Sequence, residues 1–228
     1  MKLKHLFLVC LLFFIAIGVS GCMKGQERID RMVEYINGKY SNDEFSYDHI
    51  TGGHLGSNVT TIIVSSKEYP NSPIRVMCTV VDGNEVFSDT YLGIKYETET
   101  RDYLSHLMEQ AFDSNSYVYY TPDDLGCTKT GSESSSFEEY IADPSSNVHF
   151  WAVVNYSPDN KTETLELLKK LLANVTVSGN IYFVDDSRTE LDEDTATQII
   201  EKNEYAVCLS IIKTDTVTYY KAEWRKGS

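Results

Sequence analysis

The chain has 228 residues, a formal net charge of −14 at pH 7, a hydrophobic content of 42% and an aromatic content of 12%. An acidic surface repels phosphates, which argues against nucleic acid as a partner and against electrostatic adhesion to anionic lipid. The aromatic content argues against intrinsic disorder, and the length suffices for one large domain or for two small lobes with real cores.

The N-terminus has the three-part layout of an export signal. Lys2 and Lys4 precede an uncharged run from Leu6 to Val19, and the small residues Ser20 and Gly21 follow it. As a helix this run would span about 21 Å, which is short of the roughly 30 Å hydrocarbon core of a bilayer. Its length and flanks are therefore typical of a cleaved signal at residues 1–21.

The sequence Val19-Ser20-Gly21-Cys22 resembles the lipobox of bacterial lipoprotein precursors, in which Leu is preferred where this chain has Val19. The resemblance implies cleavage between Gly21 and Cys22 and lipidation of Cys22 with a diacylglyceryl group, often with a further acyl chain on the new N-terminus. Two or three acyl chains give stable attachment, because each buried methylene contributes about 0.8 kcal/mol. An ordinary thiol after an uncleaved anchor or a secretory cut is the alternative.

Cleavage would remove two lysines and no acids, and would leave 18 basic and 34 acidic residues. Three further cysteines would remain, namely Cys78, Cys127 and Cys208. Because this number is odd, a fold stapled by disulfides is not expected. We expect Cys78 and Cys208 to be unbonded residues of buried strands, with a bridge between them as the alternative.

A first α+β lobe is predicted at residues 26–120, after a short tether at residues 22–25. Apolar residues at helical spacing predict a helix from Gln26 to about Tyr40, and a second from about Glu97 to Phe112. Runs rich in β-branched and aromatic residues predict strands at residues 45–50, 59–66, 74–81 and 86–91. Asp82-Gly83-Asn84 is typical of a tight hairpin turn.

A polar loop or linker is predicted at residues 121–136, and a second α+β lobe at residues 137–228. Ser136 and Glu139 match a capping box, and Asn160 caps a predicted helix that ends near Ala173. The remaining expected elements are strands at 148–156 and 175–184, a helix at 191–203 and a hairpin of 205–213 with 217–224. The predicted class is α+β, a mainly antiparallel sheet with helices packed on one face, in a cystatin-like arrangement in one or both lobes.

No metal site or cofactor is expected. The histidines lack the short spacings of zinc ligands, and His49 and His54 come nearest to them. The acidic stretch at 185–194 lacks the glycine and the glutamate that an EF-hand loop requires. Its last three residues, Asp192 to Asp194, instead suit the N-terminus of a helix, where negative charge meets the helix dipole.

A recognition site is predicted at two places. Gly52, Gly53 and His54 lie in a glycine-rich loop, where backbone amides and the imidazole could contact a ligand, although a plain inter-strand loop is the alternative. Tyr117, Tyr119 and Tyr120 are the aromatic group best placed to line a sugar- or peptide-binding face. Their alternative role is ordinary packing within a sheet.

No sequence pattern predicts catalysis. A thiolate mechanism would need Cys127 beside His149 or His54, and no spacing supports that pairing. We therefore expect a lipid-anchored extracytoplasmic protein of the cell membrane that binds an unidentified envelope protein or ligand without catalysis. Two alternatives stay open, the ligand-binding subunit of a transporter and a Cys- or metal-dependent envelope hydrolase.

Overall fold

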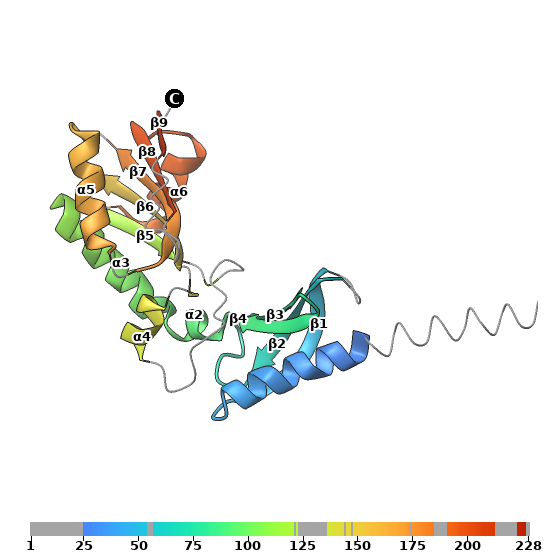
Figure 1. The fold of residues 1–228 in the computed structure, drawn as a ribbon. Coiled ribbons are helices and arrows are strands. Elements are labelled where there is room, and N and C mark those ends of the chain that lie inside the picture. Colours follow the sequence, from blue (N-terminus) through green and yellow to red (C-terminus); the bar gives the residue numbers. More distant parts are fainter. Residues whose placement is uncertain are drawn as a thin grey trace, which may run out of the picture. The chain divides into compact units, whose positions relative to one another are not determined.

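A computed structural model of the 228-residue chain gives the architecture (Figure 1). It describes residues 25–53, 57–120, 122, 136–143, 145–146, 148–173, 175–184, 191–212 and 223–226. The predicted signal and lipidation residues, including Gly21 and Cys22, lie outside these residues. So do His54, Cys127, most of the predicted linker and the acidic residues 185–190.

The chain divides into two compact units between Asp89 and Thr90. This differs from the predicted boundary at residues 121–136, which rested on the polar composition of that segment. The structure assigns the helix at 97–112 to the second unit, because the strand that follows it pairs with the strand at 148–155. Long-range strand pairing, which composition does not reveal, therefore decides the division.

The first unit contains a helix at residues 25–39 and a four-stranded antiparallel sheet (Figure 1). The strands are β1 (Phe45–Gly53), β2 (Val59–Ser66), β3 (Ile74–Val81) and β4 (Asn84–Asp89), paired in chain order. Positive φ values of 50° at Asp82 and 81° at Gly83 form the predicted tight turn between β3 and β4. A helix packed on an antiparallel meander agrees with the predicted α+β class.

Alternating residues of the first sheet form its core. Ile62, Val64, Val76 and Cys78 are fully buried, as are Met32 and Ile36 of the helix. The apolar stripe of the helix therefore supplies a layer over one face of the sheet, as the sequence periodicity predicts.

Polar side chains join the helix to β4. The buried carboxylate of Asp89 accepts hydrogen bonds from Tyr35 Oη and Tyr40 Oη, both at 2.9 Å, and from Lys39 Nζ at 2.7 Å. At the other end of β4, Glu85 forms ion pairs with Arg28 and Arg31 of the helix.

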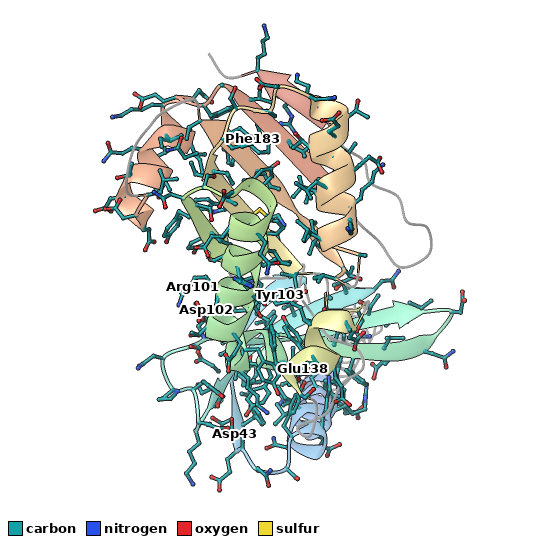
Figure 2. All side chains as sticks on the ribbon, turned by 90° about the vertical axis from the view of Figure 1, so that its left-hand side faces the viewer. Asp43, Arg101, Asp102, Tyr103, Glu138 and Phe183 are labelled. Atoms are coloured by element: carbon teal, nitrogen blue, oxygen red, sulfur yellow. The ribbon has the colours of Figure 1, made fainter. Side chains whose placement is uncertain are left out.

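A second buried carboxylate organises the bend after β2. Asp43, labelled in Figure 2, accepts hydrogen bonds from the hydroxyl of Ser66 and from the backbone amides of Lys67 and Glu68. These bonds satisfy backbone donors that leave the sheet ladder at this bend, which explains why a carboxylate is buried there.

The second unit contains five helices and five strands among its described residues. Its helices are α2 (Tyr91–Lys95), α3 (Glu97–Phe112), α4 (Phe137–Ala142), α5 (Lys161–Leu171) and α6 (Glu193–Glu201). Its strands are β5 (Ser116–Tyr120), β6 (Val148–Asn155), β7 (Val177–Val184), β8 (Val207–Ile212) and β9 (Glu223–Lys226). They pair in chain order, and every pair is antiparallel except β6 with β7, which α5 connects.

Helices cover both faces of this second sheet, whereas the sequence reading expected helices on one face. One large core joins α3, α4 and α5 to residues such as Phe150 and Phe183. Figure 2 labels Tyr103 of α3 and Phe183 of β7 in this layer. On the opposite face Ala196 and Ile199 of α6 pack with Val153 and Val184.

The predicted start signals of three helices are confirmed. Ser136 and Glu139 form the capping box of α4, Asn160 accepts from two backbone amides at the start of α5, and Asp192 accepts from the Thr195 amide. Cys78 and Cys208 are buried and free, as predicted.

Candidate functional site

Two of the first predicted recognition residues, Gly52 and Gly53, lie in a strand and not in a loop, whereas His54 is outside the described residues. Gly52 and Gly53 end β1, where they pair with Thr61 and Thr60. Gly53 has a φ of 72°, and a Cβ atom there would lie 2.1 Å from the Val59 carbonyl oxygen. Glycine is thus required at position 53 by the backbone of the sheet itself, a structural role that does not depend on a ligand.

The three predicted tyrosines lie together on β5, but they point to opposite faces of the sheet. Tyr120 is buried in the core beside α4, and its hydroxyl lies 2.7 Å from that of Tyr140. Burial raises the pKa of Tyr140 to about 12, and the Tyr120 hydroxyl partly opposes this rise. Tyr120 is therefore a structural residue, whereas Tyr117 and Tyr119 face the side that carries α6.

A row of side chains crosses the sheet from Tyr119. Strand register aligns Tyr119 with Trp151, Trp151 with Asn180, and Asn180 with Ser210. All four side chains are partly exposed. We call these four residues the open row; it presents two aromatic rings, one amide and one hydroxyl in succession.

Ring stacking orders the aromatic end of the open row. The rings of Tyr119 and Trp151 have centroids 5.0 Å apart and planes only 18° from parallel. Tyr117, two residues before Tyr119 on β5, contacts the Trp151 ring at a centroid distance of 5.8 Å. The indole is therefore held between neighbours before any ligand arrives, which lowers the entropic cost of binding.

Hydrogen bonds order the polar end of the open row. Arg225 Nη2 donates to Ser210 Oγ at 2.9 Å, and Ser210 Oγ donates to Asn180 Oδ1 at 2.6 Å. A guanidinium can only donate, so the Ser210 hydroxyl accepts a hydrogen bond from Arg225 and donates one to the Asn180 amide oxygen. Next to this chain of bonds, His149 Nδ1 lies 3.1 Å from Ser178 Oγ.

Helix α6 covers the neighbouring row of the same face. Burial raises the pKa of Tyr117, the charge of Glu193 and a hydrogen bond with it raise the pKa further, and Arg101 opposes the rise. Burial also raises the pKa of Tyr182, whose ring lies 4.9 Å from that of Tyr205. Tyr117, Val153 and Tyr182 form this covered row, and Trp151 of the open row packs against the same α6 cluster.

Cys208 and His149 are the side chains on this face whose chemistry bears on catalysis. Cys208, the thiol on this face of β8, is 3% exposed, and burial raises its pKa, so it is a poor nucleophile. His149 Nδ1 lies 3.1 Å from Ser178 Oγ, and Cys127, the thiol that a catalytic pairing with His149 would need, lies outside the described residues. In the described part of the chain, no three histidine, cysteine or acidic residues form a group that could hold a metal ion.

The sequence reading missed Trp151, Asn180 and Ser210 as candidate residues. It assigned the strands that carry them but did not follow which residues of each strand share a face. Within Val148–Asn155 every second residue points to the same side, so the sequence places His149 and Trp151 on one face, but it does not show which residues of the other strands lie beside them.

Comparisons with known proteins show no family for this chain. No protein-family model and no curated protein matches it. The chain is similar to a DUF5037 family protein from Ruminococcus gnavus ATCC 29149 in its 2.55 Å crystal structure, at 13% sequence identity and a TM-score of 0.38. That match covers 84% of this chain and 93% of the other.

Proposed function

We propose that this chain is an exported lipoprotein that is anchored through acylated Cys22 on the extracytoplasmic face of the cell membrane. There it binds an envelope ligand or partner through the open row and does not transform it chemically. The observation that carries the binding role is the ordered but partly exposed sequence of Tyr119, Trp151, Asn180 and Ser210 across the second sheet. Aromatic surface with a few placed polar groups is the usual composition of a binding site.

The start of the first unit fits a short lipid tether. Its helix begins at residue 25, so three residue steps, at most about 11 Å of extended chain, separate it from Cys22. Acyl chains would supply the membrane affinity, since the acidic chain is repelled by anionic headgroups. No helix within the described residues has the length and apolar character needed to span a membrane.

Acylation tests the anchoring part of the proposal. The full chain is expressed in cells that are fed an alkynyl fatty acid. The wild-type chain should incorporate the label, and the label should map to a peptide that begins at Cys22. The Cys22→Ser chain should carry no label and should leave the membrane fraction or keep its signal. An unlabelled wild-type chain in the cytosol would refute the proposal.

Binding to separated envelope components tests the role of the open row. The acylated chain in neutral-lipid nanodiscs is exposed to the protein, glycan and lipid fractions of the host envelope. We expect one fraction to bind the wild type and to bind Trp151→Ala at least tenfold more weakly. Tyr47→Ala is the control, because Tyr47 is 43% exposed on β1 of the other unit. Equal binding by wild type and Trp151→Ala to every fraction would refute the assignment of the site.

A further inference from the structure

We infer that the ligand of the open row is an uncharged oligosaccharide, an inference that rests on the proposed binding function. The open row places the stacked rings of Tyr119 and Trp151 in line with the neutral hydrogen-bonding side chains of Asn180 and Ser210. A sugar ring has the matching chemistry, because its C–H groups form apolar faces and its hydroxyls, at the rim, both donate and accept.

The length of the open row suits several sugar units. Tyr119 and Ser210 are separated by three inter-strand steps, which amount to about 14 Å at the usual strand spacing. A row of this length offers contacts to a short chain of rings more readily than to a single ring.

Two side chains on this face are oriented by one hydrogen bond each and keep a second polar atom that bonds no described residue. The Asn180 amide oxygen accepts a hydrogen bond from Ser210, and the described residues provide no partner for Asn180 Nδ2. Likewise His149 is bonded through Nδ1, and no described residue bonds its Nε2. Two oriented groups beside the Trp151 ring are thus available to ligand hydroxyls.

Charge argues against an anionic ligand. None of the four residues of the open row carries a formal charge, and the nearby guanidinium of Arg225 donates to Ser210. The whole chain has a net charge of −14, which repels phosphate- or carboxylate-rich polymers.

Strand pairing argues against an extended peptide that adds to the sheet. Such a peptide needs a strand with unpaired backbone groups, but β6, β7 and β8 each pair on both sides. Three of the four residues of the open row lie on these inner strands, so side chains and not backbone groups must recognise the ligand.

A glycan array that carries neutral and acidic oligosaccharides tests the inference with the full acylated chain in nanodiscs. We expect binding to neutral glycans of three or more sugars. Asn180→Asp should weaken this binding at least tenfold, because the carboxylate keeps the acceptor for Ser210 but removes both Nδ2 donors. Asn203→Asp is the matched control, since it adds the same charge in the same unit, at the exposed turn after α6.

Three results would overturn the inference: no binding to any neutral glycan, binding to acidic glycans alone, or an equal effect of the two Asp variants. If Trp151 is needed to bind an envelope protein while the neutral glycans stay unbound, the oligosaccharide inference fails and the proposed binding function stands.

Discussion

Replacement of Lys39 by methionine should expose how strongly the buried Asp89 carboxylate depends on its cation. Asp89 is fully buried, and its Oδ2 accepts from Lys39 Nζ at 2.7 Å and from the Tyr35 hydroxyl at 2.9 Å. The Lys39 side chain is only 10% exposed, so water cannot replace it easily. The Lys39→Met variant keeps most of the aliphatic stem that passes the Tyr35 and Tyr40 rings.

The expected cost follows from leaving a buried charge without its ion-pair partner. Removal of one member of a buried pair typically costs 3–5 kcal/mol. Two tyrosine hydroxyls still donate to Asp89, so we expect the lower end, about 3 kcal/mol. Since 1.4 kcal/mol corresponds to a factor of ten, protection of the first sheet against amide exchange should fall about 100-fold.

Native-state hydrogen exchange with mass spectrometry measures this loss on peptides from β2 and β3. The control is Lys67→Met in the same unit, because the ion pair of Lys67 with Glu44 is 3.5 Å long and highly exposed. Adding Asp89→Asn to Lys39→Met should restore part of the protection, since the buried group is then neutral. If Lys39→Met lowers protection no more than Lys67→Met, the reasoning is wrong.

Three further changes test the second unit and the buried thiols. Gly179→Ala should destabilise the second unit by about 3 kcal/mol in denaturant unfolding, because its Cβ would lie 1.9 Å from the Phe150 carbonyl oxygen; wild-type stability would contradict this geometry. Tyr140 has a pKa raised to about 12 in the fold, so the stability it contributes is complete below pH 10 and is lost between about pH 10 and 12. Thermal unfolding across that pH range should show that the free energy of unfolding falls by up to about 3 kcal/mol. The fall should be smaller in the Tyr140→Phe variant. Cys78 and Cys208 are buried with raised pKa values, so peptide mapping should find both alkylated by iodoacetamide only after unfolding, and rapid labelling of the folded chain would contradict their burial.

Local signals predicted most of the elements. The periodic apolar residues of α3 gave its observed bounds, and the Ser136 capping box marked the start of α4. These signals depend on residues within one or two turns of each other, so they can be read directly from the sequence.

Sequence patterns did not predict the elements whose formation depends on contacts with distant parts of the chain. Helix α2 has only five residues, a glycine at its centre and no side-chain cap, so its own sequence does not favour a helix. Packing holds it instead, because a Cβ at Gly93 would lie 2.8 Å from Pro122 and 3.1 Å from the Tyr120 hydroxyl. Strand β5 is also five residues long, and its pairing with β6 spans the whole segment that was predicted to separate two lobes.

The open row itself could not be read from the sequence because it takes one residue from each of four strands. Its composition depends on the register of three strand pairs, one of them parallel. A shift of one residue in any pair would move a side chain to the opposite face.

Strand order has a consequence for how this protein assembles. In both sheets each strand lies next to the strand that precedes it along the chain, so no strand has to insert between two others that have already paired. During synthesis from the amino end, each sheet can add strands at one edge before the later strands have been made. In the first sheet the paired strands are also close in sequence, which favours rapid folding of that unit.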